Sequence, residues 1–183
     1  MSPGAEDART GGRPLKRVIY DAATLARRVN ELGREITGAY PDGDLLLIGL
    51  LKGGVVFLAD LIRAIERPLQ LDFLVASSYG SAKVSSGNLT VHYRPRLPVA
   101  GKHIVLVEDI IDSGRTLAAL AAVLREERPR SLAICALLDK GLAPVLPAEA
   151  RFIGFRAPEA FLVGYGLDYA EDFRHLPYIA EVG

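Results

Sequence analysis

Ten consecutive residues, VEDIIDSGRT at positions 107–116, combine two neighbouring carboxylates with a loop rich in hydroxyl groups. The acids, Glu108 and Asp109, follow an apolar run, and a helical pattern begins after the loop. Adjacent carboxylates at the end of an apolar strand are costly to desolvate unless hydroxyl donors or a divalent cation meet them. The hydroxyls of a sugar that lies beside a phosphate group would provide such partners.

The second half of this segment is suited to bind the phosphate. The start of a helix presents unpaired backbone N–H groups and the positive end of the helix dipole. Gly114 lets the chain approach a ligand closely, and Ser113 and Thr116 add hydroxyl donors. The G-x-x-x-x-G-K-[ST] spacing of a P-loop is absent.

A simpler interpretation of the same residues is structural. Asp112 or Ser113 would cap the helix, and the two acids would be solvated. For a single capping residue we favour this interpretation, because helix caps are far commoner than catalytic groups. For the whole ten-residue segment we favour a ligand site.

The surrounding sequence predicts an α/β fold in which these residues follow a buried strand. Short continuous apolar runs alternate with stretches of helical periodicity, which is typical of a parallel sheet covered by helices on both faces. Ligands bind such sheets beyond the carboxyl ends of the strands. We expect strands at 45–50, 71–76, 89–93, 103–107, 131–138 and 151–155, and helices at 21–38, 55–65 and 116–126, the first with Asp21 as N-cap and Gly38 as C-cap.

Composition excludes several classes of protein. The chain has 183 residues, half of them apolar, and its 22 Lys and Arg balance 22 Asp and Glu. A neutral chain of this length predicts one domain with a sizeable core and no nucleic-acid partner. No run is apolar enough to span a bilayer, no secretory signal is present, and the lone Cys135 is consistent with a reducing compartment. We therefore expect a cytoplasmic protein without a membrane partner, with residues 1–13 as a disordered leader and 14–183 as a single domain.

The segment VEDIIDSGRTL closely resembles the signature of the type I phosphoribosyltransferases, in the form found in the 6-oxopurine branch, the hypoxanthine-guanine phosphoribosyltransferases. The resemblance extends from about Leu45 to Arg174. It implies a mainly parallel sheet with helices on both faces, a small hood and a flexible lid loop. It also implies transfer of the 5-phosphoribosyl group from phosphoribosyl pyrophosphate to hypoxanthine or guanine in purine salvage, with Mg²⁺ as cofactor and a homodimer or homotetramer as the assembly.

The resemblance assigns roles within the acidic segment. Glu108 and Asp109 would hold the ribose hydroxyls, and Asp112 would lie near purine N7 as the general acid/base. The branch often carries Thr where Ser113 stands here, and the hydroxyl is kept. The 5′-phosphate would be bound by the loop from Asp112 to Thr116, which includes Ser113, Gly114 and Arg115.

Two further segments match the family at the pyrophosphate and the lid. Lys52-Gly53-Gly54 resembles the pyrophosphate loop, in which the peptide before the lysine can be cis, and this implies a cis Leu51–Lys52 bond. Arg174 would also contact the pyrophosphate. Ser78 and Tyr79 open a long polar loop that resembles the lid. Without the resemblance, these segments would be interpreted as an ordinary glycine turn and a surface hairpin tip.

The base-binding residues come from the second half of the chain. Lys140 would donate to the purine 6-oxo group, Phe161 would stack on the ring, and the backbone of Leu162 would bind the base edge. Asp168 would contact the guanine amino group through its carbonyl and, with Glu108 and Asp109, help to hold the metal. Taken alone, a lysine at a strand end is solvated surface and an aromatic residue is core.

Two alternatives keep the fold but change the function. One is a regulator that binds nucleotides and RNA, against which the zero net charge and the combination of Phe161 with Lys140 both count. The other is a type I transferase directed to another base, such as xanthine.

Overall fold

A six-stranded sheet forms the centre of the computed structural model, which describes residues 8–78, 89–143 and 150–182. The strand order is β4-β3-β2-β5-β6-β7, and all neighbours are parallel except the antiparallel pair β3 and β4. This confirms the expected mainly parallel sheet. The strands are β2 (Leu45–Leu51), β3 (Gln70–Ser78), β4 (Leu89–Tyr93), β5 (His103–Ile111), β6 (Ser131–Asp139) and β7 (Ala150–Arg156).

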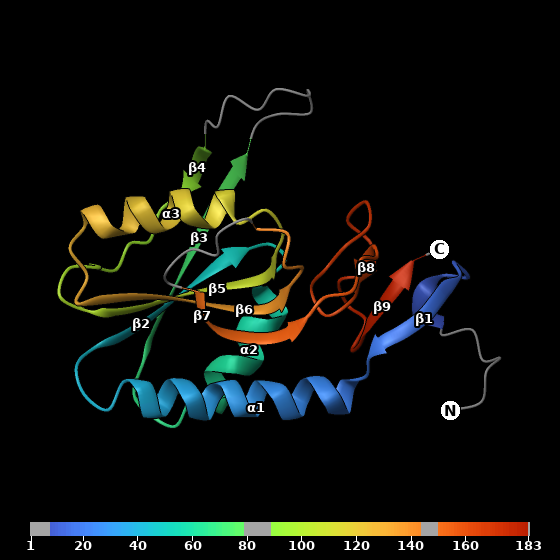
Figure 1. Cartoon of the computed structure of the whole chain (residues 1–183), viewed down its shortest axis with the longest axis horizontal. Helices are drawn as coiled ribbons and strands as arrows, with labels where there is room; N and C mark the ends of the chain where they lie inside the picture. Colours follow the sequence, from blue (N-terminus) through green and yellow to red (C-terminus); the bar gives the residue numbers. More distant parts are fainter. Residues whose placement is uncertain (1–7, 79–88, 144–149, 183) are drawn as a thin grey trace.

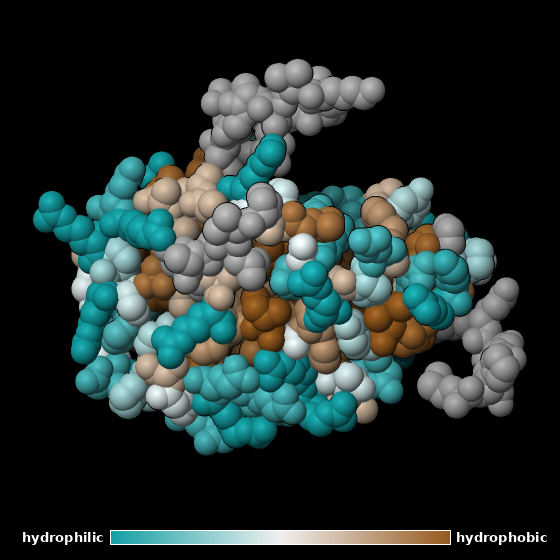
Figure 2. Space-filling model, viewed as in Figure 1, coloured by the Kyte–Doolittle hydropathy of each residue, from teal (hydrophilic) through white to brown (hydrophobic). Residues whose placement is uncertain are grey.

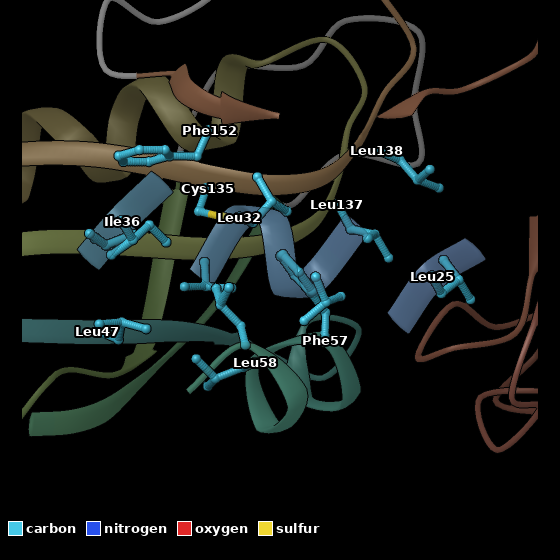
Figure 3. Close-up of a cluster of buried hydrophobic side chains, with 14 of the residues drawn as sticks. Leu25, Leu32, Ile36, Leu47, Phe57, Leu58, Cys135, Leu137, Leu138 and Phe152 are labelled. Atoms are coloured by element: carbon cyan, nitrogen blue, oxygen red, sulfur yellow. The ribbon is translucent and has the colours of Figure 1, made fainter. Parts of the chain in front are cut away.

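Helices cover both faces of the sheet, as the alternating pattern predicted. Helices α1 (Ala22–Ala39) and α2 (Val55–Ala64) lie on one face, and α3 (Arg115–Glu126) lies on the other (Figure 1). Each face has its own cluster of buried apolar side chains, and Figure 3 shows part of the cluster beneath α1 and α2. No helix among residues 8–78, 89–143 and 150–182 is both long and apolar enough to cross a membrane.

Helix α1 begins where its cap was predicted and ends later than expected. The side chain of Asp21 accepts a hydrogen bond of 2.8 Å from the N–H of Thr24. Gly38 is not the C-cap, because the helix continues to Ala39 and the buried Tyr40 follows it as the cap. Hydrophilic side chains cover most of the outer face of α1 in Figure 2. The inner face carries the residues with helical spacing, Leu25, Val29, Leu32 and Ile36, all of them buried.

A second, smaller sheet forms the hood that the family resemblance implies. It is antiparallel, in the order β1-β9-β8, and lies beside the carboxyl end of β7 (Figure 1). None of its strands was assigned from the sequence, and two of them, with two and four residues, are too short to show a clear alternation. They are β1 (Leu15–Tyr20), β8 (Leu162–Val163) and β9 (Ile179–Val182).

The expected disordered leader does not extend to residue 13. Residues 1–7 lie outside the described residues, but Ala8–Thr10 form a short 3₁₀ helix and Thr10 is buried. The guanidinium of Arg13 lies over the ring of Phe173, 4.4 Å from its centroid, and pairs with Asp172 at 2.7 Å. These contacts tie residues 8–13 to the loop that follows β8.

Candidate active site

Strand β5 carries both acids at its carboxyl end. The sequence predicted a strand over 103–107, but the ladder with β6 continues and pairs Glu108 with Ala136 and Ile111 with Asp139. The prediction stopped at the first charged residue because charge normally ends a buried strand. Here the acids are part of the ladder, so the backbone of β5 fixes their positions.

The turn from β5 into α3 lines a cavity, and no side chain caps the helix there. Gly114 is the N-cap, with a φ of 71°, a left-handed conformation that glycine adopts without steric cost. The N-cap is therefore not Asp112 or Ser113, which the structural interpretation expected, and no side-chain hydrogen bond caps the helix at Gly114. A cavity of about 200 Å³ lies at this helix start, and its polar lining comes from Glu108, Asp112, Ser113, Gly114 and Thr116. Arg115 begins the helix and is exposed.

Glu108 has an unusual electrostatic environment. Burial raises its pKa well above the usual range, and the adjacent carboxylate of Asp109 raises it further. Its Oε2 atom is buried and has no hydrogen-bond partner among the described residues. Asp109 accepts a 2.7 Å hydrogen bond from the N–H of Ile110. A buried oxygen without a partner is costly, and a ligand hydroxyl or a cation would satisfy it.

The glycine turn after β2 packs directly against the second acid. The Leu51–Lys52 peptide is cis, which confirms the expectation. A Cβ atom at Gly53 would lie 1.7 Å from Asp109 Oδ2, and one at Gly166 would lie 2.1 Å from the carbonyl oxygen of Gly53. Glycine is therefore required at Gly166, where φ is 103° and the obstacle is backbone, whereas a side chain at Gly53 would displace the carboxylate of Asp109. The turn, the acid and the segment after β8 meet at one point.

The two cations expected at the pyrophosphate meet at one carboxylate. Lys52 Nζ lies 3.1 Å from Glu171 Oε2, and Arg174 Nη2 lies 3.2 Å from the same oxygen. Arg174 Nη2 also lies 2.8 Å from Asp168 Oδ1. Hydrogen bonds from Lys52 and Arg174 lower the pKa of Glu171. Sequence analysis missed Glu171, although its position three residues after Asp168 and three before Arg174 could have pointed to it.

The lysine at the end of β6 reaches back to the helix start. Lys140 Nζ lies 3.5 Å from Asp112 Oδ2. The preceding residue, Asp139, is buried and accepts a 2.7 Å hydrogen bond from the N–H of Gly141, which fixes the turn that carries the lysine. The structure thus brings together the residues predicted to bind the 6-oxo group and to act as the general acid/base.

Phe161 presents its ring to the outside. Its side chain is 56% exposed, and the ring packs edge-on against Tyr169 with 5.4 Å between centroids. The next residue, Leu162, is buried in β8 and pairs with Glu181 of β9. An anchored backbone beside an exposed aromatic face is suited to hold a flat heterocycle.

Comparison with known proteins agrees with this geometry. Residues 17–170 match the phosphoribosyl transferase domain family. The chain belongs to the phosphoribosyltransferases. It is 44% identical over 167 residues to a hypoxanthine phosphoribosyltransferase from Escherichia coli (strain K12), covering 90% of this chain and 94% of the relative. It is also 44% identical over 165 residues to a hypoxanthine-guanine phosphoribosyltransferase from Bacillus subtilis, covering 90% and 92%.

Solved structures agree with this phosphoribosyltransferase assignment. A hypoxanthine-guanine phosphoribosyltransferase from Bacillus anthracis, with a HEPES molecule in its active site, superimposes with a TM-score of 0.88. It is 38% identical, and the match covers 93% of this chain and all of that one. A hypoxanthine phosphoribosyltransferase from Staphylococcus aureus gives a TM-score of 0.89 at 33% identity, covering 98% and 97%.

The acids of this phosphoribosyltransferase do not form a metal cage by themselves. Within residues 8–78, 89–143 and 150–182, no three His, Cys, Asp or Glu side chains are arranged to hold a metal ion. Mg²⁺ commonly binds through one or two carboxylates together with waters and substrate phosphates. The unpartnered Glu108 Oε2 fits that arrangement better than a protein-only site.

The lid lies largely outside the described residues. Ser78 is the last residue of β3, while Tyr79 and the loop after it are not described. Both assignments to a lid stay predictions.

Proposed function

We propose that this phosphoribosyltransferase transfers the 5-phosphoribosyl group from phosphoribosyl pyrophosphate to hypoxanthine or guanine, a reaction of purine salvage. The observation that carries the proposal is the cavity at the start of α3, where a buried carboxyl and the phosphate-binding loop face one space. Its size and polar lining suit a phosphorylated pentose. The names of the similar enzymes from E. coli and B. subtilis support a 6-oxopurine as the acceptor.

The donor would be held at both ends of its ribose. The N–H groups at the start of α3, with the hydroxyls of Ser113 and Thr116, bind the 5′-phosphate. The carboxylates of Glu108 and Asp109 accept hydrogen bonds from the ribose hydroxyls. Lys52 and Arg174, together with the backbone of Gly53, bind the pyrophosphate. These contacts fix the anomeric carbon between the leaving group and the base.

The acceptor would be selected by hydrogen bonding and stacking. Lys140 donates to the 6-oxo group, which excludes adenine because an amino group cannot accept that bond. Phe161 stacks on the ring, and the backbone of Leu162 binds the base edge. Asp112 lies 3.5 Å from Lys140, so a base held by the lysine presents its N7 to this carboxylate.

The reaction would be a displacement with inversion. Purine N9 forms a bond to the anomeric carbon while the bond to the pyrophosphate oxygen breaks, and the pyrophosphate leaves with the electron pair. Asp112 accepts the proton from N7. The transition state carries positive charge on the sugar and negative charge on the leaving group, and Lys52 and Arg174 stabilise the latter.

Magnesium is the cofactor that these residues suit. Glu108 and Asp109, with Asp168 acting through water, would hold it together with oxygens of the donor. When bound, Mg²⁺ supplies positive charge next to the pyrophosphate.

A competition assay tests the acceptor. Hypoxanthine, guanine, xanthine and uracil are offered together with phosphoribosyl pyrophosphate and Mg²⁺, and the nucleotides formed are measured. We expect inosine and guanosine monophosphates as the main products. Uridine or xanthosine monophosphate as the main product would contradict the assigned base pocket. No turnover together with salt-sensitive RNA binding would favour the regulator instead.

Assembly as a homodimer or homotetramer is part of this proposal and rests on the family resemblance. Sedimentation equilibrium measures it directly.

A further inference from the structure

Glu171 bonds to both cations that the proposed function assigns to pyrophosphate. Its Oε2 atom lies 3.1 Å from Lys52 Nζ and 3.2 Å from Arg174 Nη2. Lys52 comes from the turn after β2 and lies 119 positions before Glu171 in the sequence, whereas Arg174 comes from the loop after β8 and lies three positions after it. Both cations nevertheless meet at one oxygen. A carboxylate oxygen placed between two cations makes the contacts that a phosphate oxygen would make.

The backbone of the loop is shaped to present this carboxylate. Glu171 has a φ of 69° and Ala170 a φ of 52°, left-handed conformations that are uncommon for residues with a side chain. The N–H of Glu171 donates a 2.9 Å hydrogen bond to Asp168 Oδ2, and Tyr169 and Asp172 exchange backbone hydrogen bonds of 3.1 Å. The turn is therefore closed by hydrogen bonds of its own, in addition to the ion pair between Asp168 and Arg174.

The cations differ in how much they depend on Glu171. Arg174 is held independently, because Nη1 donates to the carbonyl of Gly166 at 2.8 Å and Nη2 pairs with Asp168. For Lys52, whose side chain is 69% exposed, Glu171 is the one ion-pair partner within the part of the chain that the structure describes. Glu171 is therefore the group that the lysine ammonium contacts in this structure.

We propose that Glu171 is an internal competitor of pyrophosphate, which holds Lys52 and Arg174 in the empty site and lowers the affinity of the enzyme for pyrophosphate. This inference rests on the proposed function. When the donor binds, its phosphate oxygens take the lysine from Glu171. When pyrophosphate leaves, Glu171 takes the lysine back, and product release is eased. Exposed ion pairs are individually weak, so the competition is worth a few-fold in affinity.

Calorimetric titration with inorganic pyrophosphate, with and without Mg²⁺, tests the proposal on the full chain. The variants are Glu171→Gln and Glu171→Ala, and the matched control is Asp172→Asn. Asp172 is the next residue, carries the same charge and is similarly exposed, but pairs with Arg13. The control therefore reproduces the change in net charge without freeing Lys52.

We expect both Glu171 variants to bind pyrophosphate about 3- to 10-fold more tightly than the wild type, and Asp172→Asn to stay within about twofold. The KM for phosphoribosyl pyrophosphate should fall in parallel, while the KM for hypoxanthine stays unchanged, because the base binds at Lys140 and Phe161. Thermal unfolding verifies that the variants are folded.

Unchanged or weaker pyrophosphate binding in both Glu171 variants would overturn the inference. Weaker binding would mean that Glu171 contributes to binding, as a residue near the metal would. These outcomes leave the proposed function intact as long as the wild type turns over the donor. A wild type that neither binds pyrophosphate nor turns over phosphoribosyl pyrophosphate would overturn the proposed function, and the inference with it.

Discussion

At the scale of single residues, the site is built around a carboxyl group that the fold alone does not explain. Glu108 lies next to Asp109, and its Oε2 atom is buried and has no hydrogen-bond partner among the described residues. A chain selected only for stability would place an apolar or amide side chain there. Such a residue is the mark of a site whose missing partner is a ligand.

Replacing Glu108 should separate stability from binding. Because the folded-state pKa of Glu108 lies above its unfolded value, the folded state favours the protonated carboxyl, and stability falls as pH rises through the folded-state pKa. We expect the free energy of unfolding of Glu108→Gln to exceed that of the wild type by about 1–2 kcal/mol at pH 8 and to equal it near pH 4. Urea denaturation at both pH values measures this difference.

The same variant should bind phosphoribosyl pyrophosphate at least about 10-fold more weakly, because an amide is a poorer acceptor for hydroxyls and a poor ligand for a cation. A gain in stability that is independent of pH, or an unchanged affinity, would contradict the role given to this carboxyl.

Asp112 tests the chemistry rather than the binding. Asp112→Asn keeps the shape but removes the proton acceptor, and turnover should fall by roughly 10²–10⁴. Affinity for the donor should change little, because helix α3 and the hydroxyl groups remain in place. Single-turnover kinetics measures the first quantity and calorimetry the second. Turnover within about twofold of the wild type would remove Asp112 from the proton transfer.

At the scale of elements, the predictions held for the helices and most strands of the central sheet, and failed for the hood strands and where a strand continues past a charge. Helix α1 was predicted from its N-cap and its buried spacing, and both were confirmed, although its C-cap was not. The predicted β5 ended before Glu108. Its continuation could not be foreseen locally, because the acids are held by pairing with β6, which is distant in the sequence. The hood strands were not predicted, because they form by pairing with segments that are distant in the sequence rather than from a local pattern.

The site itself was predictable in part. Motifs identified residues that the structure brings together, such as Lys140 with Asp112 and Lys52 with Arg174. Glu171 was not among them, because its role depends on two partners that meet only in the folded chain.

Two glycines allow a matched test of element packing. A methyl group at Gly53 would overlap the carboxylate of Asp109, whereas one at Gly38, on the exposed side of α1, would meet nothing. We expect Gly53→Ala to lower kcat/KM for the donor by at least about 10-fold, since a displaced turn misplaces its pyrophosphate contacts. Gly38→Ala should leave activity unchanged and stabilise the protein by about 0.5–1 kcal/mol. Kinetics and thermal unfolding of both variants check this, and equal activity of the two would contradict the packing argument.

At the scale of the whole molecule, the loop between the hood strands is joined to the helices of the main sheet. Tyr165 is buried and donates a 2.5 Å hydrogen bond to Asp60 of α2, while its backbone N–H bonds to the carbonyl of Leu176. Helix α2 begins directly after the turn that carries Lys52. The pyrophosphate turn and the loop with Asp168 and Arg174 are thus held to each other through this contact.

Removing the contact should affect stability and geometry together. We expect Tyr165→Phe to destabilise the protein by about 1 kcal/mol, because Asp60 is only partly buried and water can replace the hydroxyl. The KM for the donor should rise while the KM for hypoxanthine changes less. Urea denaturation and steady-state kinetics measure these effects. A rise confined to the KM for hypoxanthine would contradict the claim that this contact positions the pyrophosphate-binding residues.

Calorimetry of phosphoribosyl pyrophosphate with the full chain tests the central claim most directly. In the presence of Mg²⁺ we predict one donor site per chain, with affinity reduced in Glu108→Gln and retained in Asp112→Asn, and hypoxanthine binding to the complex afterwards. If the donor fails to bind both with and without Mg²⁺, the cavity at the start of α3 is not a phosphoribosyl site.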